Sequence, residues 1–135
     1  MSVELCVLHR TTVPIDRDSW QANLDALGLP VQLDARLDPS LARGFQPVAL
    51  RGHSTGFELD RFPAADYAPA PDNGSEYDAA CVFRWSGDTS EMAAALACAA
   101  ALAALTQGIV YDPQEGETYS PEAAVDLARE GLGAL

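Results

Sequence analysis

The stretch AACVFRWSGDTSEMAAALACAAALAALTQGIVY, residues 79–111, decides the fold class because it predicts a strand, a long helix and a second strand. Residues 79–85 form an apolar strand pattern that ends at Ser86-Gly87-Asp88. Asp88, with Glu91 three residues later, has the spacing of a capping box and opens a helix over residues 91–107, which Gly108 ends. Because alanines occur on every face of this helix, we expect it to be buried, its small side chains allowing close approach to a sheet.

The N-terminal part predicts a strand and a short amphipathic helix. Residues 3–8 alternate with the period of two that is typical of a strand with one buried face. Asp16 is placed to cap a helix over residues 17–27, and Ile15 can pack against Trp20 across its first turn. Gly28 and Pro30 supply the stop, and residues 31–33 predict a short strand.

The middle of the chain predicts a hairpin followed by a long loop. Residues 48–50 and 56–59 are apolar pieces separated by residues 51–55, which include Gly52 and His53 and give the spacing of a hairpin. Residues 44–47 are interpreted as turn and loop. Residues 63–78 contain three prolines and a turn cluster without regular periodicity, so they predict the longest loop of the chain.

The C-terminal part adds a strand and a helix. Residues 109–111 are a strand pattern with a turn at Asp112-Pro113, and Ser120 with Pro121 predicts a capped helix over residues 121–130. The order of elements favours a single α+β domain over residues 1–135. We expect a two-layer sandwich, with a mixed or mainly antiparallel sheet of about five to six strands carrying about three helices on one face.

The net charge of the chain limits the classes of partner that it is expected to bind. Eight Lys+Arg against twenty Asp+Glu give a formal net charge of -12. This excess of negative charge disfavours nucleic acid and anionic membranes as partners and would attract a basic protein, although acidity also serves solubility alone.

The cysteines and the N-terminus predict a cytoplasmic location. Cys6, Cys81 and Cys98 are odd in number, lack CxxC spacing and lie in apolar segments, so we expect buried thiols in a reducing compartment. The first residues lack the pattern of a secretion signal. The apolar run at residues 92–105 is too short to span a bilayer and is interpreted as a core helix.

Catalytic, metal and cofactor motifs are not found in the sequence, and we predict neither an enzyme nor a cofactor or metal site. His9 and His53 are the obvious general bases, yet no nucleophile motif, phosphate loop or CxxC pair accompanies them. The spacing of Asp112, Glu115 and Glu117 does not match a calcium loop. A small enzyme whose acid and base come from His53, Asp60 or Asp112 stays open as an alternative.

Two acidic segments are the candidate contact surfaces. Long loops without structure are often functional, and tyrosines among carboxylates suit an interface with a cationic partner. A solvated loop without a partner is the alternative. The candidate residues of the loop are Asp66, Tyr67, Asp72, Glu76, Tyr77 and Asp78, and those of the predicted hairpin at residues 112–117 are Asp112, Glu115 and Glu117.

Two stretches carry a resemblance to a known class of proteins: GFQPVALRGHSTGFE, residues 44–58, and GIVYDPQEG, residues 108–116. They look like small uncharacterised bacterial proteins that often resemble immunity proteins encoded beside polymorphic toxins or secreted effectors. The likeness covers about a third of the chain. It implies a cytoplasmic protein without enzymatic activity that binds a cognate toxin and occludes its active site, and it transfers a role to no individual residue.

The sequence therefore predicts an immunity-type inhibitor with a basic partner. Two other functions stay open: a small enzyme or metabolite-binding protein, and a structural or regulatory module that pairs with itself as a homodimer through an exposed strand edge.

Overall fold

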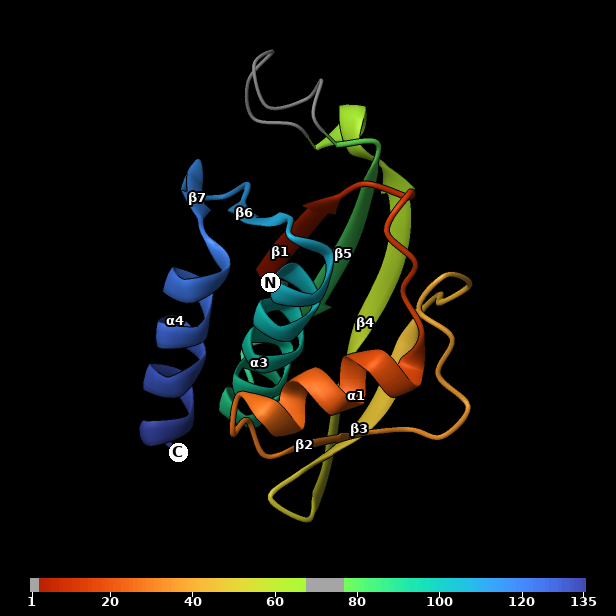
Figure 1. The fold of residues 1–135 in the computed structure, drawn as a ribbon. Coiled ribbons are helices and arrows are strands. Elements are labelled where there is room, and N and C mark those ends of the chain that lie inside the picture. Colours follow the sequence, from red (N-terminus) through yellow and green to blue (C-terminus); the bar gives the residue numbers. More distant parts are fainter. Residues whose placement is uncertain (1–2, 68–76) are drawn as a thin grey trace.

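A computed structural model describes residues 3–67 and 77–135, and in this part of the chain three α-helices lie on one face of a seven-stranded sheet (Figure 1). The strands are β1 Val3–His9, β2 Val31–Leu33, β3 Phe45–Leu50, β4 His53–Pro63, β5 Ala79–Trp85, β6 Ile109–Asp112 and β7 Glu117–Tyr119. The helices are α1 Arg17–Ala26, α3 Thr89–Thr106 and α4 Pro121–Gly133, with a single 3-10 turn, η1, at Ala64–Asp66.

The sheet has the strand order β2-β3-β4-β5-β1-β6-β7, and every neighbouring pair is antiparallel. This confirms the α+β two-layer class and, of the two sheet types expected, the antiparallel one. The strand count is higher than the expected five to six because residues after the turn at Asp112 pair back onto β6 as β7. The predicted strand, helix and strand of residues 79–111 are β5, α3 and β6. The two strands, β5 and β6, lie on either side of β1 and run parallel to each other.

The helix starts follow the local signals in the sequence. The side chains of Asp16, Asp88 and Ser120 each accept a hydrogen bond from a backbone N–H in the first turn of α1, α3 and α4 respectively. These bonds satisfy N–H groups that have no partner inside the helix. The capping box expected at α3 is only half formed, because the Glu91 carboxylate accepts from Ser86 instead of from the backbone of Asp88.

The hairpin of β3 and β4 is confirmed, but both strands are longer than predicted. Arg51 and Gly52 have φ values of 51° and 83°, the left-handed conformation that a two-residue type I′ turn requires. His53 therefore begins β4, paired with Leu50, instead of lying in the turn. The interpretation of residues 44–47 as a loop was wrong from Phe45 onward. Pro47 is tolerated because β2 pairs only with residues 48–50, which leaves β3 at the local edge of the sheet at this proline.

The expected loop at residues 63–78 was also partly wrong. Strand β4 extends to Pro63, because residues 58–63 pair with β5, and η1 follows it. Residues 68–76 of this segment lie outside the described residues.

Helix α3 is the centre of the helical layer. It packs against the sheet, α1 and α4, and eight of its alanines are completely buried. Its 18 residues are long and apolar enough, by composition, to cross a membrane, and it is the one such helix in the described ranges. Its burial between the sheet and two helices agrees with the expectation of a core helix. The Trp20 indole of α1 donates to the carbonyl of Cys98 and fixes the two helices relative to each other.

The end of α3 depends on a close approach to β1. Gln107, not Gly108, takes the left-handed conformation at the helix end, with φ 56°. A Cβ on Gly108 would lie 2.2 Å from the carbonyl oxygen of Leu8. Glycine is required at position 108 because there is no room for a side chain.

Candidate functional site

The sheet has two faces of different character. Alternate residues of each strand point to opposite sides, and one set, including Val7, Phe57 and Phe83, lies in the main core against the helices. In the described part of the chain no α-helix covers the other side, which we call the open face. Figure 1 shows the three helices gathered on the same side of the strands. The open face is therefore a surface of the sheet that the helical layer leaves uncovered.

A second, smaller apolar cluster lies on the open face. Its buried members come from β1, β5 and η1, and they are Cys6, Leu8, Ala64, Ala80 and Val82. The side chains that cover this cluster are partly buried, and they are Phe62, Tyr67, Tyr77, Ile109 and Tyr111. Four of these five are aromatic, and Phe62 and Tyr67 are in contact, with ring centroids 5.5 Å apart. Aromatic side chains, and no α-helix of the described residues, thus cover this apolar cluster.

Arg84 of β5 is the centre of a polar network at the border of this cluster. Its Nε donates to Glu4 at 2.8 Å, one terminal nitrogen lies 3.4 Å from Asp60, and the other donates to the Tyr67 hydroxyl at 3.1 Å. The guanidinium carbon lies 5.8 Å from the centroid of the Phe62 ring. Four interactions of one side chain therefore join β1, β4, β5 and the residue after η1.

The charged groups of this network shift the pKa values of Arg84 and Tyr67. The pKa of Arg84 is raised, first by its hydrogen bond to Glu4 and further by the nearby charge of Glu4 and Asp60. The pKa of Tyr67 is raised by partial burial and by the negative charge of Glu4. Arg84 is therefore cationic and Tyr67 protonated at neutral pH, and the two carboxylates leave the network with a net negative charge.

The structure brings two of the loop candidates together. Tyr67 and Tyr77 pack on the same apolar cluster, and Asp66 is exposed at the end of η1. Asp78 accepts two hydrogen bonds from Thr11, one from its backbone N–H at 2.8 Å and one from its hydroxyl. It therefore has a structural role next to the face. The remaining candidates, Asp72 and Glu76, lie outside the described residues.

The second group of candidates lies in the hairpin of β6 and β7. Asp112 accepts hydrogen bonds from the backbone N–H groups of Gln114 and Glu115 and so stabilises the turn. Glu115 and Glu117 are exposed. Tyr111, which precedes Asp112 on β6, belongs to the apolar cluster of the open face. Tyr111 therefore lies on the open face, whereas Asp112 and Glu117 lie on the side of Val110 and Tyr119, which pack with the main core.

Several residues of this face were not found from the sequence, namely Glu4, Glu58, Phe62, Arg84 and Tyr111, and Asp60 was named only as a possible acid or base of the alternative enzyme. The register places Glu4 and Glu58 directly opposite Arg84 on its two neighbouring strands. The available signal is in β4, where the charged Glu58 and Asp60 flank the buried Leu59, an alternation that indicates a sheet with one face on the core and one in water.

The histidines do not form an acid–base group with the carboxylates named in the alternative reading. His53 and Asp60 are seven residues apart on β4 and therefore lie on opposite faces, and Asp112 is on β6, separated from β4 by β5 and β1. His9 is 1% exposed, and its Nε2 lies 3.4 Å from the Cys81 sulfur. Burial lowers the pKa of His9 and raises the pKa of Cys81 to about 11, so both groups are neutral near pH 7.

All three cysteines are buried free thiols, as predicted. Burial also raises the pKa of Cys6 to about 12 and that of Cys98 still further. Over residues 3–67 and 77–135, no three His, Cys, Asp or Glu side chains are grouped so that they could hold a metal ion.

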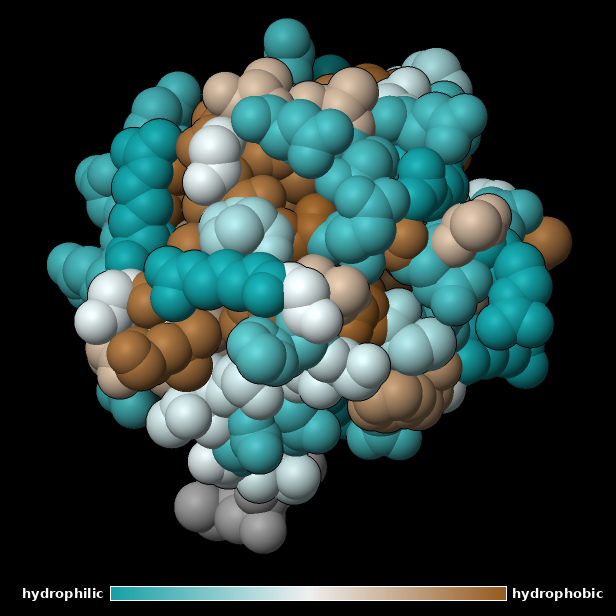
Figure 2. Space-filling model, turned by 90° about the horizontal axis from the view of Figure 1, so that it is seen from below, coloured by the Kyte–Doolittle hydropathy of each residue, from teal (hydrophilic) through white to brown (hydrophobic). Residues whose placement is uncertain are grey.

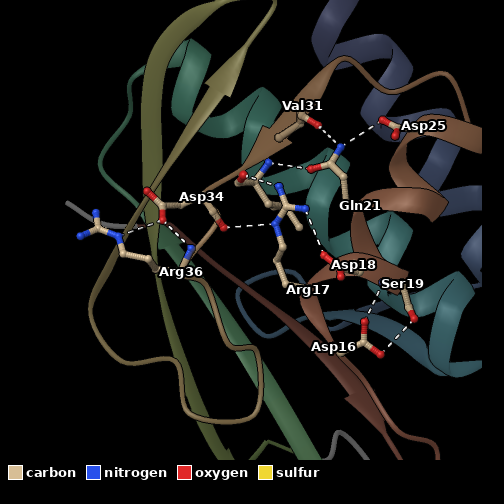
Figure 3. A network of polar contacts seen from close by, with 10 residues as sticks. Asp16, Arg17, Asp18, Ser19, Gln21, Asp25, Val31, Asp34 and Arg36 are labelled. Atoms are coloured by element: carbon tan, nitrogen blue, oxygen red, sulfur yellow. Dashed lines mark hydrogen bonds and ion pairs between the residues drawn. The ribbon is translucent and has the colours of Figure 1, made fainter.

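The β2 edge of the sheet is closed by side chains of α1 (Figure 3). Gln21 accepts from the Leu33 N–H at 2.8 Å and donates to the Val31 carbonyl at 2.9 Å. One residue of a parallel neighbouring strand would make the same two bonds. Arg17 donates to the carbonyls of Leu33 and Asp34. Another strand could pair with this edge only by displacing Gln21 and Arg17.

The surface seen from the lower end of Figure 1 is mainly hydrophilic, with hydrophobic areas between the polar side chains (Figure 2). The large hydrophobic residues that are exposed in the described part are Leu41, Phe45 and Leu135. Of these, Phe45 is on a sheet strand, and its register opposite Glu58 places it on the open face.

Comparison of the chain with protein-family models, with curated proteins and with solved structures finds no match.

Proposed function

We propose that this protein is a cytoplasmic immunity-type inhibitor, which captures a basic toxin or effector domain on its open face and occludes the active site of that domain. The observation that carries the proposal is a sheet face that no α-helix of the described residues covers, on which aromatic side chains lie among carboxylates. The resemblance of residues 44–58 and 108–116 to immunity-type proteins points to the same function.

The aromatic side chains of the open face supply the contact area. Tyr and Phe give large, rigid contacts at low cost in conformational entropy, and they are enriched in protein interfaces. Tyr67, Tyr77 and Tyr111 are each half-buried over one apolar cluster, so their rings are already positioned before a partner binds. Such preorganisation reduces the free-energy cost of association.

The charge of the chain selects the partner. A net charge of -12 accelerates encounter with a cationic protein and disfavours a polyanion. A toxin domain that acts on nucleic acid or nucleotides often has a positive cleft, in which acidic side chains would compete with the phosphates of the substrate.

Co-expression tests the proposal. Bacteria that produce the toxin or effector encoded by the neighbouring reading frame are expected to survive when this chain is produced with it. The two proteins are then expected to purify as one complex. Toxicity that persists although this chain is folded and abundant would eliminate the immunity function.

Paired charge variants test whether the acidic hairpin of β6 and β7 takes part in binding. The double variant Glu115→Gln/Glu117→Gln is expected to slow association with the toxin and to weaken the dependence of the rate on salt, since steering is screened by ions. Asp126→Asn/Glu130→Gln removes the same charge from exposed positions on α4, in the helical layer, and is the matched control. Equal effects of the two variants would show that net charge matters and that location does not.

The two other functions predict different outcomes. Turnover of a substrate that is lost in His53→Ala would favour an enzyme. A stable homodimer in the absence of any other protein, measured by mass, would favour self-association. Pairing through the β2 edge would break both bonds of Gln21 to the strand, so such self-association would have to use the other edge strand, β7.

A further inference from the structure

A cavity of about 210 Å³ lies at the end of β5, beside the open face. Phe45, Phe57 and Trp85 contribute its aromatic walls, and Glu58, Ser86 and Glu91 contribute polar groups. Pockets that hold drug-sized ligands enclose about 300–1,000 Å³. This cavity is therefore matched to one long side chain and is small for a metabolite.

One wall of the cavity is an aromatic ring held in an exposed position. Phe45 is 56% exposed, yet its ring crosses β4 directly above Gly56. A Cβ on Gly56 would lie 2.4 Å from Cζ of Phe45 and 2.5 Å from the carbonyl oxygen of Gln46. The absence of a side chain at position 56 is therefore what allows the ring to approach the backbone of β4 so closely and to line the cavity.

The charge of the cavity is negative and largely uncompensated. Arg84 also lines it, but the guanidinium is already bound to Glu4, Asp60 and Tyr67. Glu58 makes no ion pair in the described ranges, although it is directly opposite Arg84 in the register. Glu91 accepts only long bonds from Ser86, of 3.3 and 3.4 Å. Among the described residues, the two carboxylates therefore line the cavity without an ion pair of their own, and Arg84, the cation beside them, is already bound to other carboxylates.

We infer that this cavity anchors one cationic side chain, an arginine or a lysine, of the partner protein. The aliphatic stem would pack on Phe45 and Trp85, and the charged head would lie between Glu58 and Glu91. Aromatic rings attract cations through their electron-rich faces, and long basic side chains bury their stems against apolar surface. The inference rests on the proposed function, because it identifies the subsite by which a basic partner is recognised.

A small-molecule titration tests the anchor pocket without the partner. Nα-acetyl-argininamide is the probe, and the citrulline analogue, which has the same shape but no charge, is the matched ligand. By NMR, the arginine probe is expected to shift the indole N–H resonance of Trp85 at millimolar concentration, and the citrulline analogue is not. The Trp20 indole is buried and bonded to the Cys98 carbonyl, so its resonance is the internal reference and is expected to stay in place.

Variants of the lining residues complete the test. Glu58→Gln and Glu91→Gln are each expected to weaken binding of the arginine probe about fivefold, the effect of losing one partly exposed charge contact. Phe45→Ala is expected to weaken it as well, and Glu130→Gln on α4 is the control that leaves it unchanged. Equal binding of both ligands, no binding, or wild-type affinity in the glutamine variants would overturn the inference.

The outcome for the pocket is separable from the outcome for the proposed function. If the probe binds as expected but co-expression gives no protection from the toxin, the cationic site stands and the immunity function fails. If protection is complete but the probe does not bind at Trp85, the immunity function stands and the partner is anchored elsewhere.

Discussion

The two faces of the sheet are built from the same strands but differ in how completely their side chains are buried. On the helix side, Phe83 lies between Trp20 and Phe57, and all three are at most 1% exposed. On the open face, Phe62 and Tyr67 pack over a smaller cluster and remain partly exposed. Burial is most complete where three helices exclude water, so stability is concentrated on the helix side. The open face keeps surface that a partner can use.

Equivalent truncations on the two faces give the largest expected effect. Phe83→Ala is expected to lower the free energy of unfolding by about 4 kcal/mol, because it removes a fully buried ring and leaves a cavity. Phe62→Ala, the same change on the open face, is expected to cost about 1–2 kcal/mol, since part of that ring already contacts water. Urea unfolding measures both. Equal losses would show that the open face is as much a core as the helix side.

Removal of the buried polar side chain of Gln21, on α1, is expected to have the second largest effect on stability. Gln21→Ala leaves the Leu33 N–H and the Val31 carbonyl without partners, and we expect a loss of about 2 kcal/mol in unfolding free energy. The same change also opens the β2 edge, so analytical ultracentrifugation is expected to detect association at high concentration. A variant that is both fully stable and monomeric would contradict the assignment of Gln21 as an edge cap.

The polar network of the open face is expected to contribute less. Arg84→Met keeps much of the aliphatic stem but leaves Glu4 and Asp60 without their cation, and the expected loss is about 1 kcal/mol because all three side chains are partly solvated. Arg36→Met is the control, since the Arg36 side chain is 90% exposed and its ion pair is expected to contribute almost nothing. A loss near that of Phe83→Ala would make the network a second core.

The smallest expected effect is a dependence of stability on pH. Burial lowers the pKa of His9 below its ordinary value of 6.5. Below that pH the unfolded chain takes up a proton that the folded protein resists, so the free energy of unfolding falls until the lowered pKa is passed. Unfolding in urea between pH 7.5 and pH 5 measures this slope, which His9→Gln is expected to reduce. Several carboxyl groups, including Asp16 and Asp88, also have lowered pKa values, but these act at more acid pH.

Local signals in the sequence predicted the elements, and long-range pairing decided the rest. Asp16, Asp88 and Ser120 are caps that need only their own first turn, so these helix starts were found. The length of β4 was missed, because residues 60–63 become strand only by pairing with β5, where Pro63 marks the end. Phe45 was assigned to a loop because Gly44 and Pro47 flank it.

The candidate site divides in the same way. Tyr67 and Tyr77 were found because they stand in an unusual segment that is rich in acid and proline. Arg84 was not, since its significance comes from Glu4, eighty residues earlier in the chain, and from Asp60 on a third strand. The pairing of strands, which no local pattern specifies, brings these three together.

The position of β1 has a consequence for how the chain is made. Strand β1 precedes the other described strands and is an interior strand, and both of its neighbours, β5 and β6, are encoded about seventy residues or more later. At a synthesis rate of about 5–20 residues per second, its apolar side chains wait several seconds for a partner. During that interval the unpaired β1 is a target for chaperones, and the sheet can close only after β6 has been made.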